Sequence, residues 1–279
     1  MIPPTLKLWL TLATTLLLFA CLPEKKDDLL SICNASPELC EQFHDIGDCR
    51  YKRTSLIRAL YYKELDPESK SSSPLLEALE GYESCLEPRL FIEFSKRKER
   101  KTQRIENYLH TQKLIEEELI NSKGTKDPHL AYYLWTRYKD VSAKKVFLKA
   151  ANDPNLNDIS LLTKLATFYY KRKPQKALKL FYRVLQQSHS LDDISIDVFS
   201  YIMTIYYSNK QFEQAYIWAY ILNNVDSDEQ YNVDFELILN RGLRNTSRKI
   251  KHQDKLQEKA NKYLLLLEQG QFNLNASKK

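Results

Sequence analysis

Cysteine is the residue type with the clearest chemistry in this chain, because four cysteines gather in one window and none follows them. These are Cys33, Cys40, Cys49 and Cys85. The gaps of six, eight and 35 residues between them do not match the close pairs, such as C-x-x-C, that hold zinc. An even number of cysteines in an exported chain indicates two disulfides, with three possible connectivities. His44 lies nearby, and we expect a surface side chain there rather than a metal ligand.

A fifth cysteine, Cys21, directly follows an apolar run of 13 residues from Leu8 to Ala20. The run has the length of a signal-peptide core and is too short for a comfortable transmembrane helix. Its end, Leu18-Phe19-Ala20-Cys21, resembles a bacterial lipobox, in which the cysteine carries acyl chains such as palmitate, although Phe19 is bulkier than usual. The alternative is an ordinary secretory signal. Because Leu22 rather than Asp follows, we expect anchoring in the outer membrane, facing the periplasm.

The helices expected around the cysteines favour one connectivity. Apolar residues at helical spacing predict helices over about 51–65 and 75–86, joined as an antiparallel hairpin by a polar loop. This hairpin brings Cys49, just before the first helix, near Cys85, late in the second. We therefore favour Cys49–Cys85, with Cys33–Cys40 as a local bridge, while the other two connectivities stay open.

One pair of residues could belong to an enzyme. Glu83-Ser84 resembles the catalytic pair of lytic transglycosylases, all-helical cell-wall enzymes whose Glu acts as a general acid. The downstream Gly-Leu-Met-Gln type motif of that family is missing, and Cys85 follows directly. The sequence contains no H-E-x-x-H, G-x-S-x-G or phosphate-binding G-x-x-x-x-G-K-[ST] motif. We expect no enzyme activity, no cofactor and no metal.

Composition favours helices and a folded body. Only 5 of the 279 residues are glycine, whereas Leu, Lys, Glu, Gln and Tyr are plentiful. The net charge of +6 is spread along the chain, so we expect a solvated surface and no nucleic-acid binding. The densest basic run, Lys96–Lys101, could touch anionic lipid or glycan, but a solvated helix face is the favoured interpretation.

That basic run lies in a segment from Arg89 to Asn121 for which we expect one long or broken helix. A thin stripe of apolar residues would dock this helix onto the rest of the cap. The stripe consists of Ile105, Tyr108, Leu109, Ile115 and Leu119.

The stretch from Leu161 to Leu222 contains the same helical hairpin twice. Six positions recur 38 residues apart, with internal steps of four, three, nine, four and three. The two sets are Leu161, Leu165, Phe168, Ala177, Phe181 and Val184, and Phe199, Met203, Tyr206, Ala215, Ala219 and Leu222. The order of large, small and aromatic positions resembles the tetratricopeptide repeat. A third, degenerate hairpin over His129–Ala151 precedes them.

Mapping the repeat resemblance residue by residue implies a groove on the first helix of each hairpin. The implied lining is Leu162, Ala166, Tyr169, Tyr170, Asp197, Ser200, Thr204, Tyr207 and Ser208. Tyrosines and small polar side chains suit an extended peptide or a partner helix. The candidate partner-binding residues are Tyr169, Tyr170, Thr204, Tyr207 and Ser208. Alternatively, neighbouring helices cover this face.

Several stretches carry a more specific resemblance. Cys33–Cys40, Gly47–Arg50 and Arg53–Ile57 look like the N-terminal signature of an uncharacterised family of predicted Gram-negative lipoproteins, domain of unknown function family 2989. Leu165–Tyr169 and Ala215–Ala219 resemble the same family further along. The resemblance implies a location and an architecture, but no activity.

We therefore predict an all-α protein: a short tetratricopeptide-like helical-repeat solenoid with a disulfide-stapled N-terminal helical cap. Its expected parts are a signal peptide (1–20), a lipid-anchored tether (21–30), the cap with a long charged helix (31–125), helical hairpins (126–226), capping helices (227–270) and a disordered tail (271–279). The expected role is a scaffold or adaptor that binds an envelope protein or peptide, with the membrane contacted through the N-terminal lipid. The alternatives are a structural subunit of an envelope complex and, less favoured, a cell-wall enzyme.

Overall fold

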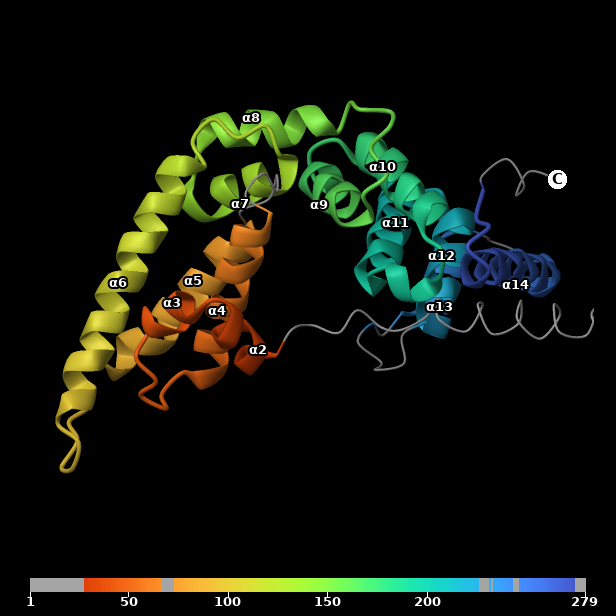
Figure 1. The fold of residues 1–279 in the computed structure, drawn as a ribbon. Coiled ribbons are helices and arrows are strands. Elements are labelled where there is room, and N and C mark those ends of the chain that lie inside the picture. Colours follow the sequence, from red (N-terminus) through yellow and green to blue (C-terminus); the bar gives the residue numbers. More distant parts are fainter. Residues whose placement is uncertain (1–27, 67–72, 226–230, 232, 243–245, 274–279) are drawn as a thin grey trace, which may run out of the picture. The chain divides into compact units, whose positions relative to one another are not determined.

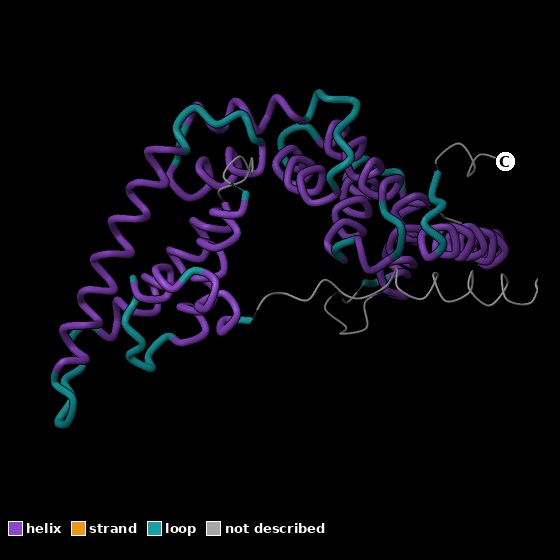
Figure 2. Tube along the Cα trace, viewed as in Figure 1, coloured by secondary structure: helices purple, strands orange, loops and turns teal. Residues whose placement is uncertain are grey.

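The chain folds into helices joined by loops, and the computed structural model describes residues 28–66, 73–225, 231, 233–242 and 246–273. Over those residues no strand occurs, which confirms the all-α prediction (Figure 1, Figure 2). The expected signal peptide, Cys21, most of the tether and residues 274–279 of the tail lie outside the described residues. No helix in the described ranges is both long enough and apolar enough to cross a bilayer.

The chain divides into two compact units, residues 1–123 and 124–279. The helices of unit 1 are α2 (Leu29–Ala35), α3 (Pro37–Glu41), α4 (Arg50–Leu65), α5 (Ser73–Leu86), the 3₁₀ turn η2 (Glu87–Arg89) and α6 (Glu99–Asn121). Helix α2 begins inside the expected tether, because the Asp28 carboxylate accepts the Ser31 N–H at 2.7 Å and caps the helix.

The core of unit 1 lies where α4 and α5 pack as a hairpin and α6 packs on α5. Its buried members come from α2 through α6 and are apolar or aromatic. They are Ile32, Leu39, Phe43, Ile46, Leu56, Ile57, Leu75, Leu79, Tyr82, Leu86 and Ile115. The hairpin predicted around residues 51–86 is therefore confirmed as the centre of the cap.

Helix α6 differs from the expectation in where it begins and in what it buries. It begins at Glu99 rather than near Arg89, because Arg97 adopts a left-handed φ of 65° that a helix cannot contain. Ile105 and Leu109 are 37% and 57% exposed, so the predicted apolar stripe is wrong at these positions. The buried residues of α6 are Arg104, Asn107, Thr111, Ile115 and Glu118.

Unit 2 consists of consecutive helical hairpins. Their helices are α7 (Pro128–Tyr138), α8 (Val141–Ala150), α9 (Ile159–Tyr170), α10 (Pro174–Gln187), α11 (Ile196–Ser208) and α12 (Phe212–Val225), with the 3₁₀ turn η3 (Leu191–Asp193) between α10 and α11. α7 packs on α8, α9 on α10 and α11 on α12. The degenerate hairpin predicted over His129–Ala151 is confirmed, and Asp127 caps α7 as its position before Pro128 indicates.

Most of the repeated positions form the contact between the two helices of each hairpin. Ala177 and Ala215 are fully buried, consistent with the close helix approach that a small residue permits. Phe168, Met203 and Tyr206 are only half-buried. The Tyr206 hydroxyl forms a 2.8 Å hydrogen bond with the Tyr182 hydroxyl of the preceding hairpin.

The C-terminal helices are α13 (Phe235–Gly242) and α14 (Thr246–Glu268), and both pack on α12. Both lie within the range 227–270 in which the capping helices are expected. The segment after α14 is not a disordered tail at its start, because Phe272 is 4% exposed. Its ring lies 5.5 Å from the Tyr263 ring and 6.0 Å from the Trp218 ring, so aromatic packing fixes this part of the tail.

Candidate functional site

Both predicted disulfides are present in unit 1. Cys33–Cys40 joins α2 to α3 with a Cα–Cα distance of 5.6 Å, and Cys49–Cys85 joins the residue before α4 to α5 at 5.9 Å. The connectivity favoured from the hairpin is confirmed. These four cysteines are consumed as structural cross-links, so none offers a free thiol for catalysis or metal binding.

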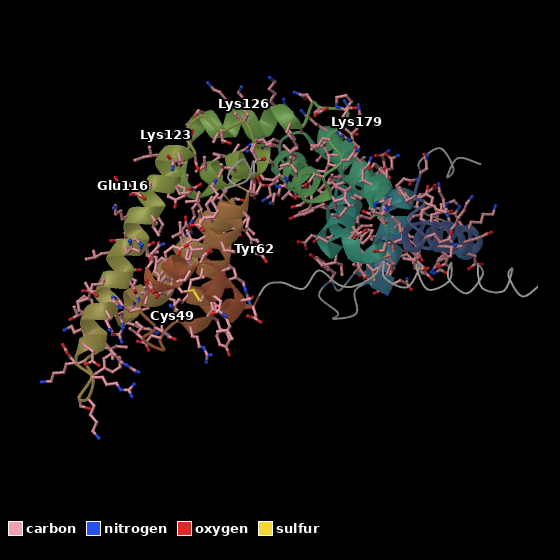
Figure 3. All side chains as sticks on the ribbon, in the orientation of Figure 1. Cys49, Tyr62, Glu116, Lys123, Lys126 and Lys179 are labelled. Carbon is pink, nitrogen blue, oxygen red and sulfur yellow. A yellow bond between two sulfur atoms is a disulfide. The ribbon has the colours of Figure 1, made fainter. Side chains whose placement is uncertain are left out.

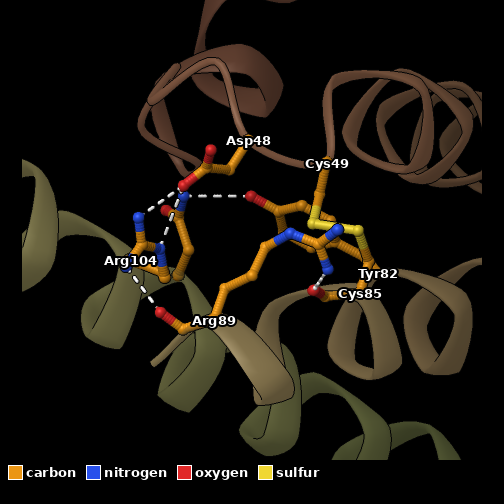
Figure 4. The surroundings of a disulfide bond; sticks show 7 residues. Asp48, Cys49, Tyr82, Cys85, Arg89 and Arg104 are labelled. Atoms are coloured by element: carbon orange, nitrogen blue, oxygen red, sulfur yellow. Dashed lines mark hydrogen bonds and ion pairs between the residues drawn. A yellow bond between two sulfur atoms is a disulfide. The ribbon is translucent and has the colours of Figure 1, made fainter. Parts of the chain in front are cut away.

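A fully buried arginine lies beside the second disulfide (Figure 4). The Arg104 Nε donates to the Asp48 carboxylate at 3.1 Å, and Nη2 donates to the same oxygen. Its Nη1 donates to the backbone carbonyls of Arg89 at 2.6 Å and Ile92 at 3.1 Å. Arg104 therefore ties α6 to the loop before Cys49 and to the loop after α5.

Asn107, one turn further along α6, continues this polar contact. Its Oδ1 accepts the His44 N–H at 2.8 Å, and its Nδ2 donates to the His44 carbonyl at 2.9 Å and to the Tyr82 hydroxyl at 3.0 Å. Burial raises the pKa of Tyr82 to about 12, so this hydroxyl stays protonated at neutral pH. We define Arg104, Asn107 and Thr111 as the polar seam of α6. The bonds of Arg104 and Asn107 all go to protein groups, which gives the seam a structural role.

The Glu83-Ser84 pair does not have the surroundings of a catalytic acid. Glu83 is partly exposed and Ser84 exposed, and the Glu83 carboxylate accepts a hydrogen bond from the Gln112 amide at 3.1 Å. A glycosidase acid is enclosed by the protein, whereas the Glu83 side chain is partly open to solvent. Within the described ranges, no group of three or more His, Cys, Asp or Glu side chains is placed to hold a metal ion.

The predicted groove residues separate into two groups in the structure. Tyr170, Thr204 and Ser208 line one hollow of about 270 Å³ between α9 and α11. The remaining lining residues are Lys171, Pro174, Ile205 and Asn209. We define these seven residues as the hairpin hollow. It combines an aromatic ring, hydroxyls, an amide and one cationic side chain, which can bind a peptide by stacking and hydrogen bonding.

Tyr170, which lines the hollow, is held in place by packing against other aromatic rings. The Tyr170 ring lies 4.7 Å from the Tyr201 ring, which in turn stacks on Phe181 at 5.5 Å. Burial, together with the neighbouring Asp197 carboxylate, raises the pKa of the Tyr201 hydroxyl. The ring of Tyr170 is thus preorganised, which lowers the entropic cost of using it as a contact.

The prediction that Tyr169 lines the groove is wrong. Tyr169 is 8% exposed and lies beneath the Lys176 ammonium, which is 4.3 Å from its ring centre. Adjacent helix residues point about 100° apart, so Tyr169 and Tyr170 cannot both face the hollow. Leu162 and Ala166, also mapped to the groove, are fully buried where α9 packs against α10 and α11.

Tyr207 also lies outside the hollow. Its ring packs edge-on against Phe212 at 5.6 Å, and the Arg241 guanidinium lies 5.7 Å from its centre. Sequence reasoning also missed a second concave surface of unit 2, of about 700 Å³. Its lining residues are Lys126, Pro128, Val146, Lys149, Ala150, Asn152 and Asp153. The sequence gives no sign of it, because it forms where the end of α8 meets the start of α7.

One comparison assigns a family to the chain. The model of the family described as protein of unknown function (DUF2989) matches residues 18–220, more than half of the chain. The chain belongs to the DUF2989 family. The DUF2989 match extends from Leu18, just before Cys21, through the four disulfide cysteines and the hairpin hollow to Tyr220 in α12. No curated protein and no solved structure matches the chain.

Proposed function

We propose that this DUF2989 protein is lipid-anchored through Cys21 in the outer membrane, faces the periplasm, and acts as a helical-repeat scaffold that binds an envelope protein or peptide. Support for export comes from the lipobox resemblance at Leu18–Cys21 and from the two disulfides, which are typical of an oxidising compartment. The anchor would keep unit 1 and unit 2 at the membrane surface without a spanning helix.

The single observation that carries the binding role is the hairpin hollow. Two consecutive hairpins, whose repeated positions lie 38 residues apart, leave a concave surface between α9 and α11. Tetratricopeptide-like repeats present their first helices in this way, and extended ligands bind there. Tyr170 is the aromatic contact, and Thr204, Ser208 and Asn209 supply hydrogen-bonding groups.

Site-specific crosslinking in the cell envelope tests this role. A photoreactive amino acid placed at Ser208, which is exposed, should give a discrete crosslinked product with one partner protein or peptide. The matched control is the same amino acid at Lys179, on the exposed side of α10 (Figure 3), which should give none.

The same experiment distinguishes the alternatives. Equal crosslinking from Ser208 and Lys179 would favour a structural subunit that is contacted on several sides within a complex. A third probe at Lys149 lies on the second concave surface, and crosslinking from this position alone would place the binding surface there. A product made of peptidoglycan fragments alone would favour the cell-wall enzyme. For the anchor, Cys21→Ser should abolish incorporation of a clickable fatty acid, and label retained by this variant would contradict the lipobox interpretation.

A further inference from the structure

The loop between η2 and α6 presents two large apolar side chains to solvent. Phe91 is 85% exposed and Ile92 is 49% exposed. The loop, residues 90–98, projects beyond the neighbouring helices of unit 1 at the start of α6 (Figure 1). Single exposed apolar residues are ordinary on a protein surface, so their meaning depends on what surrounds them.

The same loop carries three cationic side chains. Lys96, Arg97 and Lys98 are all exposed, and no ion pair is formed by any of the three with the rest of the described chain. The nearest acidic residue of the loop, Glu93, is already paired with Lys101. The loop therefore combines positive charge that no ion pair compensates with exposed apolar side chains.

The polar seam of α6 fixes the conformation of this loop. Arg104 donates hydrogen bonds to the carbonyls of Arg89 and Ile92, and its guanidinium lies 4.8 Å from the centre of the Phe94 ring. Arg100 lies over the same ring at 5.7 Å. Phe94 is thus held inward by two arginines, while the adjacent Phe91 and Ile92 point to solvent. A loop fixed in this way loses little conformational entropy when it binds.

We infer that residues 90–98 are a docking tip for the anionic phospholipid surface of a bilayer. Phe91 and Ile92 enter the interfacial region, and Lys96, Arg97 and Lys98 contact lipid phosphates. Apolar side chains flanked by cations are the combination that binds a membrane interface, because each cation also gains from the negative surface potential. A soluble acidic ligand would use the charges but would leave Phe91 and Ile92 exposed.

The docking tip adds an orientation to the proposed lipid anchor, yet it does not depend on that anchor. An acyl chain on Cys21 would hold the chain near the membrane through a short tether, and a second contact made by the same molecule gains from the high effective concentration. The tip would then fix which face of unit 1 meets the lipid.

Limited trypsin digestion of the full chain bound to vesicles tests the docking tip, because Lys96, Arg97 and Lys98 are themselves trypsin sites. Vesicles containing phosphatidylglycerol should slow cleavage at these sites at least about fivefold relative to pure phosphatidylcholine vesicles, the gain expected from even one cation at an anionic surface. The exposed turn Lys171–Lys173 is the internal control, and its cleavage rate should not change. The N-terminal apolar segment is present with both vesicle types, so its contribution to membrane binding cancels in the comparison of the two cleavage rates.

One double variant and a change of salt concentration separate the apolar contribution from the charge contribution. Phe91→Ser with Ile92→Ser retains every trypsin site and should lose most of the protection. Cleavage without vesicles at Arg53 and Arg58 in α4 should stay as slow as in the unchanged protein, which shows that unit 1 is folded. High salt should also remove the protection, because it screens exposed charges. Equal protection by both lipids, undiminished protection of the double variant, or protection by peptidoglycan sacculi but not by vesicles would each overturn the inference.

Discussion

Arg104 is a charged side chain with no exposure to solvent, so its hydrogen bonds determine whether unit 1 is stable. It has one ionic partner, Asp48, and two backbone partners, the carbonyls of Arg89 and Ile92. A buried ion pair contributes little compared with apolar packing, but loss of Arg104 removes the donor to the Asp48 carboxylate and to the Ile92 carbonyl, while the Arg89 carbonyl keeps the Ile92 N–H at 3.0 Å. The polar seam therefore stabilises one arrangement of the loops around α6.

Arg104→Met should lower the free energy of unfolding of unit 1 by about 2 kcal/mol, less than for a fully buried pair, because the Asp48 carboxylate that loses its partner is 30% exposed. Hydrogen exchange of the α6 amides in urea measures the loss. The matched control is Arg100→Met, the same substitution one turn earlier at a partly exposed position, which should cost less than about 1 kcal/mol. Similar losses in the two variants would show that the buried hydrogen bonds are not what matters.

His110 makes unit 1 sensitive to pH. It lies beside the Phe43 ring, with ring centres 5.2 Å apart, and its burial, with a smaller effect of Lys113, lowers its pKa. The unfolded chain therefore binds a proton at His110 at a higher pH than the folded chain does, starting near pH 6.5. The stability of unit 1 should be complete above that pH and should fall as the pH is lowered through the folded pKa.

Urea denaturation at a series of pH values between neutral and acidic measures this dependence. His110→Gln should show a smaller loss of stability over the same range, and the difference between the two proteins isolates His110 from other titrating groups. The same slope in both proteins would contradict the assignment.

Residue-scale features were the hardest to predict from the sequence. Arg104, Asn107 and Thr111 recur at helical spacing, but polar residues in such a pattern normally mark the solvated face of a helix. The apolar residues Ile105 and Leu109 gave the opposite signal and turned out to be exposed. Two of these seam residues are buried because they form hydrogen bonds with Asp48 and with the backbone of His44. Both groups are distant from α6 in the sequence, so no local pattern indicates these contacts.

Helical elements were predicted well because their signals are local. Steps of three and four residues between apolar positions predicted the hairpins, and the hairpin expected from His129 begins one residue earlier, at Pro128 after the cap Asp127. The face that each helix turns to its neighbours was predicted less well. Tyr169 and Tyr170 are neighbours in the sequence, and only packing against α10 and α11 determines which of them is buried.

The end of α14 gives a prediction about an element boundary. Gly270 has a φ of 62°, and a Cβ atom there would lie 2.4 Å from the carbonyl oxygen of His189. The close approach of the two backbones directs the chain so that Phe272 reaches Trp218 and Tyr263. Alanine at this position would strain the backbone and also push His189 away.

Gly270→Ala should destabilise unit 2 by at least about 2 kcal/mol, the sum of left-handed strain and a steric clash. The control is Gly124→Ala, where φ is 75° but no atom lies within 4 Å of the new Cβ. That variant should lose only about 1 kcal/mol, from the left-handed conformation alone. Urea unfolding, followed by the fluorescence of Trp135 and Trp218, measures the loss in both variants. Equal losses would mean that the contact between residue 270 and His189 is unimportant.

At the scale of the whole chain, the covalent cross-links belong to one unit only. Both disulfides lie before residue 123, and no cysteine follows Cys85. Unit 2 relies on apolar and aromatic packing of its hairpins instead. This division was predictable from cysteine positions and repeat spacing, whereas the basic loop before α6 was not, since its sequence is compatible with the helix that follows it.

The two disulfides should contribute unequally to the stability of unit 1. Cys49–Cys85 closes a loop with a sequence separation of 36, and Cys33–Cys40 closes one of 7. The chain-entropy model gives about 4 kcal/mol for the longer loop and about 2 kcal/mol for the shorter. The double variant Cys49→Ser with Cys85→Ser should therefore destabilise unit 1 more than Cys33→Ser with Cys40→Ser does. Hydrogen exchange of the α4 and α5 amides measures both losses, with the α9–α12 amides of the cysteine-free unit as the reference. Equal losses, or a larger loss from the short bridge, would show that strain or residual structure rather than loop length sets the contribution.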